Sequence, residues 1–259
     1  KMTDLNCIWV ATVPRTGSMW TTNVVREIFT SANYNSLPKI VIKSDIDILN
    51  FYNSTVINDL NKSNKYFLKI HKKLTVLPPR SKIITNIRNP YDICASFHEF
   101  MKCDLDRSIA VAADLSVWIN YYKKLDKNLF QIRYENIEKN PISIIEDLAD
   151  YCEVKINKSE INSIDFKFNK KNVQELIKKN HDEMEIQTKK NLNIDQEKIV
   201  KLSNGYQRYI DSNTGFQSGH ISKRNSGEWK KVFSPQEIKI IIEKLDTIAV
   251  ELGYPSEKN

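Results

Sequence analysis

The sequence predicts an α/β protein built on a parallel sheet. Short apolar runs rich in strand-forming residues occur at 7–13, 66–70, 82–87 and 129–133. Segments with apolar residues at helical spacing lie between and after these runs. Strands that alternate with helices along a chain pair in parallel, because each helix returns the chain to the edge at which the next strand starts.

The first strand is expected from Cys7 to Val13, where Pro14 and Gly17 end the apolar run. The residues after Gly17 recur at helical spacing, and the apolar ones are Trp20, Val24, Val25, Ile28 and Phe29. We therefore expect a strand, a tight loop and a helix in direct succession.

Helices are also predicted around the later strands. Pro90 suits the first turn of a helix, and apolar residues at helical spacing continue from it to Phe100. A longer helix is expected over 109–125, and another follows Pro141. The polar stretch 157–220 is predicted to form helices joined by mobile loops that cover the site.

The last helix has the clearest boundaries. Ser234, Pro235 and Glu237 supply an N-cap residue, a first-turn proline and a capping-box glutamate, and Gly253 follows the last turn. The sequence contains no internal repeat and no interdomain linker, so residues 1–259 are predicted to form one domain.

Composition narrows the classes of protein. The chain has 259 residues, 41% of them apolar, and no apolar stretch approaches the roughly 20 residues that cross a bilayer. No signal-peptide pattern is present, so a cytoplasmic protein without a membrane partner is expected. The cysteines form no C-x-x-C pair and are expected to be reduced thiols rather than disulfides or a zinc site: Cys7, Cys94, Cys103 and Cys152.

The formal net charge of +7 favours anionic partners. Nucleic acid, an anionic membrane and a multiply charged small ligand all satisfy this condition, and charge alone leaves the three open. The lysines and arginines are spread along the chain without a dense block, as on an ordinary solvated surface.

The loop after the first strand, residues 14–20, has the sequence PRTGSMW. It offers the N–H groups of a helix N-terminus, a flexible glycine, hydroxyls, and an arginine that can make a paired contact with phosphate oxygens. An ordinary turn is the alternative, because a single motif of this kind has many chance matches. The spacing and lysine of a Walker A loop are absent, which argues against an ATP or GTP phosphotransferase of that type.

Lys69 and His71 lie at the end of the second predicted strand. Strand alternation places both side chains on one side of the sheet, about 7 Å apart along the strand. Histidine can accept a proton near neutral pH, and lysine can stabilise charge on a leaving oxygen. The alternative is a surface histidine in a basic run. The other histidines lack a strand-end setting and are predicted to be non-catalytic: His98, His181 and His220.

A second anion site is predicted where the third strand ends. Arg88 follows that strand, and Ser96 lies eight residues later in the helix that Pro90 opens. The reversal of the chain brings the strand end back beside the helix, so that guanidinium and hydroxyl can share one phosphate. The alternative is a pair between Arg88 and Asp92 at the start of the helix.

Taken in order, these motifs resemble the sulfotransferase family. The family's loop for 5'-phosphosulfate has the pattern P-K/R-S/T-G-S/T-x-W, its K-T-H element has the spacing of 69–71, and its R-N/D-P-x-D-x-x-x-S segment is matched over 88–96. The segment 227–230 (GEWK) is similar to the family's G-D-W-K. The resemblance implies a three-layer α/β/α fold with a central parallel sheet, like that of P-loop NTPases.

The resemblance also implies ligand-binding roles. The residues implied at the 5'-phosphosulfate lie in the first loop: Arg15, Thr16, Gly17, Ser18 and Met19, the last at a position where many animal cytosolic members have threonine. Those implied around the adenine are aromatic: Trp20, Tyr134 and Phe166. Those implied at the 3'-phosphate are Arg88, Ser96, Ser222, Lys223 and Arg224, although 222–224 do not keep the family's R-K-G order.

By the same resemblance, the chain transfers a sulfuryl group from 3'-phosphoadenosine 5'-phosphosulfate (PAPS) to a hydroxyl or amine, without a metal ion, and releases 3'-phosphoadenosine 5'-phosphate (PAP). His71 would be the general base, with Lys69 and Arg15 stabilising charge. Two other classes stay open: a nucleotide-dependent phosphotransferase, and a basic nucleic-acid-binding protein without catalysis. The expected partner is a small-molecule acceptor and not nucleic acid.

The segments 33–65 and 167–219 carry no family motif and are expected to form the acceptor pocket. Acidic residues near predicted pocket loops would suit a cationic acceptor, such as a guanidinium or amine natural product: Asp104, Asp106, Asp182, Glu183 and Glu185. The oligomeric state is left open.

Overall fold

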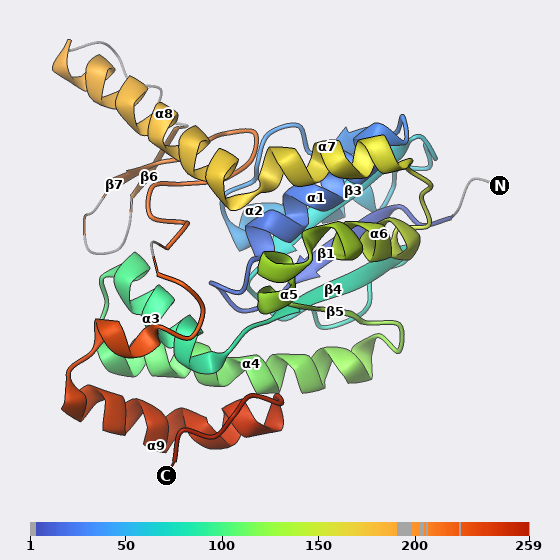
Figure 1. Ribbon diagram of the computed structural model, residues 1–259. Coiled ribbons are helices and arrows are strands. Elements are labelled where there is room, and N and C mark those ends of the chain that lie inside the picture. The colour runs from blue at the N-terminus through green and yellow to red at the C-terminus, as the bar shows by residue number, and fades with distance from the viewer. Residues whose placement is uncertain (1–3, 191–197, 202–204, 206, 223, 259) are drawn as a thin grey trace.

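The computed structural model describes residues 4–190, 198–201, 205, 207–222 and 224–258 (Figure 1). Its main sheet is parallel, with the strand order β2, β3, β1, β4, β5. The strands are β1 (Cys7–Ala11), β2 (Asn35–Leu37), β3 (Asn64–Ile70), β4 (Ser81–Ile87) and β5 (Phe130–Arg133). The parallel sheet predicted from the alternating pattern is thus confirmed.

The central strand β1 is buried along its whole length. Cys7, Trp9 and Ala11 belong to the core on one face of the sheet, and Ile8 belongs to the core on the other face. Because both faces are covered, the strand is a continuous apolar run instead of an alternating one.

Helices cover both faces of the sheet and complete a three-layer α/β/α fold (Figure 1). One face carries α1 (Ser18–Ser31), α6 (Pro141–Tyr151) and α7 (Lys158–Phe168). The opposite face carries α3 (Pro90–Met101), α4 (Leu105–Leu125) and α9 (Pro235–Glu251). Each of these helices presents an apolar stripe to the sheet or to a neighbouring helix.

The remaining elements surround this body. They are α2 (Asp45–Phe51), a π-helical turn (Tyr52–Val56), α5 (Tyr134–Lys139), α8 (Lys170–Lys189), a 3₁₀ helix (Trp229–Val232), and the antiparallel pair β6 (Ile199–Lys201) and β7 (Gln207–Tyr209). Figure 1 shows α8 extending away from the body with β6 and β7 beside it.

The structure differs from the predicted elements mainly at short segments. β2 was not predicted, because three residues are too few to show an alternating pattern. β1 ends at Ala11 and not at Val13, and the Thr12 hydroxyl donates to the carbonyl of Asn86 at 3.0 Å. α4 begins at Leu105, where the side chain of Asp104 accepts from the backbone N–H of Arg107.

The C-terminal helix α9 begins as predicted. The Ser234 hydroxyl accepts from the N–H of Glu237, and the Glu237 carboxylate accepts from the N–H of Ser234. Just before it, Trp229 stacks on Tyr91 of α3, with ring centroids 4.8 Å apart and an interplanar angle of 15°. The GEWK segment therefore attaches the C-terminal part of the chain to α3.

None of the helices within the described ranges has both the length and the apolar character needed to cross a membrane.

Candidate active site

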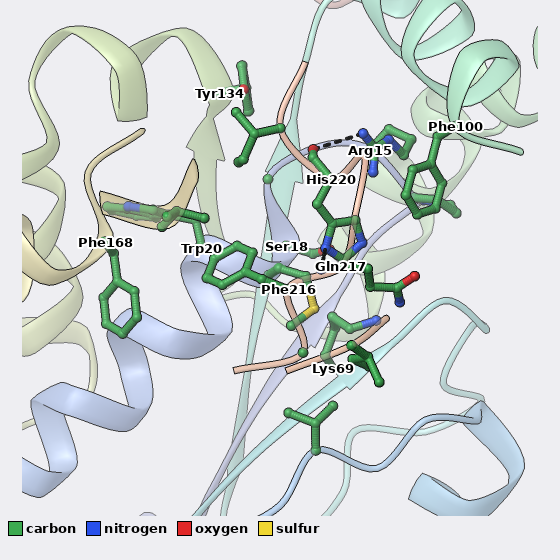
Figure 2. A pocket seen from close by; sticks show the side chains of 18 of the residues that line it. Arg15, Ser18, Trp20, Lys69, Phe100, Tyr134, Phe168, Phe216, Gln217 and His220 are labelled. Carbon is green, nitrogen blue, oxygen red and sulfur yellow. Dashed lines mark hydrogen bonds between the residues drawn. The ribbon is translucent and has the colours of Figure 1, made fainter. Parts of the chain in front are cut away.

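A cavity of about 960 Å³ opens at the carboxyl ends of the parallel strands (Figure 2). The segments that follow β1, β3, β4 and β5 all contribute lining residues: Arg15, His71, Arg88 and Tyr134 are examples. Ligands of α/β proteins bind at this edge, because the loops that follow parallel strands meet there.

The loop between β1 and α1 forms one wall of the cavity. Arg15 and Gly17 have φ angles of 71° and 92°, in the left-handed region that favours glycine. A Cβ atom at Gly17 would lie 3.0 Å from Tyr134 Cδ2 and 3.2 Å from Ile137 Cδ1, so both backbone and space require glycine there. α1 then begins at Ser18, beside the cavity, with first-turn N–H groups that have no intrahelical acceptor.

Thr16 does not present its hydroxyl to the cavity. The side chain is fully buried, and its Oγ1 donates to the carbonyl of Val13 at 3.0 Å and lies 3.1 Å from Thr12 Oγ1. The hydroxyl therefore stabilises the loop from inside, and Thr16 is not among the lining residues. A role of Thr16 at the 5'-phosphosulfate stays a prediction.

The Arg15 guanidinium contacts two other segments, α3 and the loop that contains His220. Its Nε donates to Ser96 Oγ at 3.0 Å, its Nη2 donates to the carbonyl of His220 at 3.0 Å, and its Cζ lies 4.1 Å from the centroid of the Phe100 ring. Burial, followed by the nearby Arg88 cation, lowers the pKa of Arg15. A guanidinium remains charged at neutral pH, so the cavity holds a poorly solvated positive charge.

Arg88 lies directly behind Arg15. Its Nη1 donates to the carbonyl of Arg15 at 2.9 Å, and its Cζ lies 4.0 Å from the centroid of Tyr134. Both Arg88 and Ser96 contact Arg15, so the two predicted residues are brought together through it. No ion pair joins Arg88 to Asp92 among the residues described; Asp92 accepts from the backbone N–H of the GEWK segment at 2.8 Å.

His71 and Lys69 share one side of the sheet, as strand alternation predicts. His71 Nδ1 lies 2.7 Å from the carbonyl oxygen of Thr12, which can only accept, so Nδ1 carries the proton. Nε2 therefore has a lone pair, 3.1 Å from Lys69 Nζ. Burial and the Lys69 cation lower the pKa of His71 to about 3, and the imidazole is neutral at pH 7.

His220 is a cavity residue that the sequence did not predict. Its Nδ1 accepts from the backbone N–H of Gln217 at 3.1 Å, so the proton of the neutral ring lies on Nε2. The ring stacks on Phe100, with centroids 5.1 Å apart (Figure 2). Burial and the cations Arg15 and Lys69 lower the pKa of His220 well below 6.5. The residue lies in a loop without any strand-end pattern, so no local signal pointed to it.

Aromatic residues line the cavity at the side of α1 and α7. Trp20 and Phe168 are 9% and 3% exposed, and Figure 2 shows both on the same side of the cavity. Phe166, predicted to close the adenine site, is 69% exposed and does not line the cavity. Phe168 continues the buried stripe of Ile161 and Ile164 at helical spacing and Phe166 does not, so this pattern could have identified Phe168 as the buried aromatic that lines the cavity.

Ser222 and Arg224 do not line the cavity, although Ile221 and Asn225 on either side of this segment do. Ser222 Oγ accepts from the N–H of Arg224, and the Arg224 guanidinium pairs with Glu99. Arg224 Nε is buried without a hydrogen-bond partner among the described residues. Lys223 lies outside the described residues, and the role of the three residues at the 3'-phosphate stays a prediction.

The acidic residues expected to suit a cationic acceptor do not line the cavity. Asp104 caps α4, while Glu183 and Glu185 face lysines of α8, with Lys179 Nζ 3.9 Å from Glu183 Oε1 and Lys189 Nζ 3.6 Å from Glu185 Oε2. Over the described ranges, no three histidine, cysteine or acidic residues gather in a way that could hold a metal ion.

Comparison with known proteins places the chain in a family. The sequence matches the sulfotransferase domain family over residues 5–247. It is 24% identical over 179 residues to an amine sulfotransferase from Oryctolagus cuniculus, which is 61% of this chain and 59% of that protein. It is also 24% identical over 195 residues to a luciferin sulfotransferase from Photinus pyralis, which is 60% of this chain and 53% of that protein. The chain thus spans somewhat over half the length of these curated relatives.

Solved structures show the same fold. A retinol dehydratase in complex with retinol and PAP superimposes with a TM-score of 0.59 at 17% identity, over 96% of this chain and 83% of that chain. A mouse sulfotransferase complexed with PAP gives 0.58 at 16% identity, over 95% and 88%. These likenesses establish the fold, and the family match extends over nearly the whole sequence. The chain therefore belongs to the sulfotransferase family.

Proposed function

We propose that this chain, acting as a single domain over residues 1–259, transfers a sulfuryl group from PAPS to a hydroxyl or amine of a small-molecule acceptor. The observation that carries the proposal is the joint placement, in one cavity, of a neutral histidine with a fixed tautomer, the buried Arg88 and the half-buried Arg15. The structural relatives that contain PAP support the choice of nucleotide.

The residues of the cavity fit a ligand with two anionic groups. Arg88 Nε is buried and has no hydrogen-bond partner in the described part of the chain, and a charged donor in that state is costly unless an anion pairs with it. Burial also lowers the pKa of Arg15, and a phosphate beside it would oppose this effect. Trp20 and Tyr134 offer ring faces on which a base can stack.

In this proposal Arg15, Ser18 and the N-terminus of α1 hold the 5'-phosphosulfate, and Arg88 with Ser96 holds the 3'-phosphate. Bound PAPS supplies an activated sulfuryl group. The chain supplies positive charge where the leaving oxygen becomes negative, from Arg15 and from Lys69.

His71 is the proposed general base. Its Nε2 lone pair accepts from Lys69 Nζ at 3.1 Å in the structure. When Lys69 turns to the leaving oxygen of PAPS, this lone pair is free to take the proton of the acceptor hydroxyl or amine. The bond from Nδ1–H to the Thr12 carbonyl holds the ring in the tautomer that this task needs. His220 Nε2–H adds a neutral donor that can orient the acceptor oxygen. The scheme assigns every proton and charge to these side chains and includes no metal ion.

The test is transfer of ³⁵S from labelled PAPS to a panel of alcohols, phenols and amines. Wild-type protein should form labelled products, and His71→Ala should lower kcat by about a hundredfold to ten-thousandfold, because it removes the base. The PAP dissociation constant of His71→Ala, measured by calorimetry, should change little. His181→Ala, a half-exposed histidine of α8 that does not line the cavity, is the matched control and should keep full activity.

A fully active His71→Ala protein would refute the assigned base. Two further measurements address the alternative classes of function. Transfer of ³²P from labelled ATP would favour a phosphotransferase, and steeply salt-dependent binding of DNA or RNA without affinity for PAP would favour a nucleic-acid-binding protein.

A further inference from the structure

Beyond His71, apolar side chains from two elements line the cavity. Phe97 and Phe100 of α3 lie on one side, and Ile199 of β6 and Ile210, just after β7, contribute on the other. The guanidinium of Arg208 in β7 donates to the carbonyl of Phe100, which joins the β6–β7 pair to the end of α3. This part of the cavity therefore favours an apolar ligand body.

The charged side chains that line this same part are cationic. Arg107 lies in the first turn of α4 and Lys201 at the end of β6, and both are exposed. Among the described lining residues, the carboxylates are Glu138 of α5 and Asp165 of α7, which belong to the side of the cavity with Tyr134 and Trp20. The elements that carry Arg107 and Lys201 contribute no lining carboxylate within the described ranges.

These two cations are not needed for the nucleotide in the proposed function. The residues assigned to PAPS lie in the β1–α1 loop, α1, α3 and the ends of β3 and β4, with Tyr134 at the start of α5, whereas Arg107 and Lys201 lie on α4 and β6. The carboxylates of Asp104 and Asp106 offset the partial positive charge at the N-terminus of α4, but neither residue lines the cavity. The charges of Arg107 and Lys201 therefore favour a negative group on the second substrate.

Building on the proposed function, we infer that the acceptor is an alcohol or phenol with an apolar body and a carboxylate at the end remote from the hydroxyl. The hydroxyl lies at His71, the apolar body packs between the end of α3 and the β6–β7 pair, and the carboxylate faces Arg107 and Lys201. This specificity is opposite in charge to the cationic acceptor that the acidic residues of the sequence suggested.

The test uses phenols with a para alkyl chain that ends in a carboxylate, an amine or a methyl group, over a series of matched chain lengths. Two quantities are measured for each compound: its dissociation constant from the protein–PAP complex by calorimetry, and kcat/KM with PAPS. Two exposed ion pairs should favour the carboxylate over the amine by roughly tenfold in both quantities, with an optimum at one chain length.

Charge-reversing variants test whether Arg107 and Lys201 cause the preference for a carboxylate. Arg107→Glu and Lys201→Glu should each lower the kcat/KM of the carboxylate analogue relative to that of the methyl analogue. Each should raise the kcat/KM of the amine analogue relative to that of the methyl analogue. Glutamate suits the first turn of α4, so Arg107→Glu should fold normally, which circular dichroism checks. Lys244→Glu on the exposed side of α9 makes the same charge change away from the cavity and should leave both ratios unchanged.

The outcomes separate the inference from the proposed function. Preference for amines, absence of binding by all three series, or unchanged ratios in both Arg107→Glu and Lys201→Glu would overturn the inference, even if sulfated products form. Preferential binding of carboxylates without any sulfated product would support the inference and contradict the proposed sulfotransferase activity.

Discussion

At the scale of single residues, two histidines of one cavity are held in opposite hydrogen-bonding states. His71 has a lone pair on Nε2 because its Nδ1–H donates to the Thr12 carbonyl. His220 has its proton on Nε2 because its Nδ1 accepts from the Gln217 N–H. Burial and neighbouring cations keep both rings neutral. A hydroxyl needs one acceptor and one donor, and this pair supplies both.

We therefore expect His220→Phe to lower kcat/KM by about tenfold to a hundredfold, since the substitution keeps an aromatic ring beside Phe100 but removes the Nε2–H donor. His220→Gln, which can place an N–H near the same position, should recover much of the loss. Steady-state kinetics with PAPS and an acceptor measure both effects. Equal losses in the two variants, together with weaker PAP binding, would show that His220 only supports the loop.

Arg88→Ala should weaken PAP binding by about tenfold to a hundredfold, because a charge-assisted hydrogen bond to phosphate is lost. Calorimetric titration with PAP measures the change. Lys244→Ala on α9 is the control, because it also removes one positive charge. Unchanged PAP affinity in Arg88→Ala would show that Arg88 does not bind the 3'-phosphate.

At the scale of elements, the β1–α1 loop depends on Gly17 for two reasons that can be separated. Its φ of 92° disfavours any side chain, and a Cβ would also meet Tyr134 at 3.0 Å. Gly227 has a similar φ of 88° but nothing within 4 Å of its Cβ position. The two glycines therefore have similar backbone angles, but only Gly17 has a steric neighbour at its Cβ position.

Gly17→Ala should lower PAP affinity by about tenfold or more, because the loop or Tyr134 must shift. Gly227→Ala should cost only about 1–2 kcal/mol in the free energy of unfolding and keep PAP affinity. Denaturant titration and calorimetry measure the two quantities. Equal PAP affinity in the two variants would contradict a steric role of Tyr134 and Ile137 beside Gly17.

Trp229, at the start of the 3₁₀ helix, attaches the C-terminal part of the chain to α3. The ring is 1% exposed and stacks on Tyr91, so Trp229→Ala should lower the free energy of unfolding by about 3–5 kcal/mol. Val250→Ala, at a position of α9 that is 50% exposed, should change it by less than about 0.5 kcal/mol. Equal denaturation midpoints for the two variants would contradict the structural role of the GEWK segment.

At the scale of the whole molecule, the site couples folding to pH. Histidines of the unfolded chain titrate near pH 6.5, while the pKa of His71 is lowered to about 3 and that of His220 is also lowered. Between pH 6.5 and 3 the unfolded chain therefore binds more protons than the folded one. The stability that these neutral rings retain above pH 6.5 is lost as the pH falls through this window.

We expect the free energy of unfolding of the wild-type protein to fall towards pH 4 more steeply than that of a variant with both His71→Ala and His220→Phe. The difference in slope should approach two protons, about 2.7 kcal/mol per pH unit. Denaturant titrations at a series of pH values measure it. Parallel slopes in the two proteins would show that the two rings are not held neutral by the fold.

The sequence by itself determined the parallel α/β arrangement and the positions of Arg15, His71 and Arg88 at strand ends. These features follow from local patterns, since an apolar run bounded by turn residues marks a strand, and parallel strands end at one shared edge. The start of α9 was predictable for the same reason, because its capping residues are adjacent in the chain.

Only the tertiary structure decided which way side chains point and which distant segments meet. It turned the Thr16 hydroxyl inward and brought the carbonyl oxygen of His220 to 3.0 Å from Nη2 of Arg15. Contacts of this kind join residues far apart in the chain and depend on how whole layers pack, which no local pattern encodes.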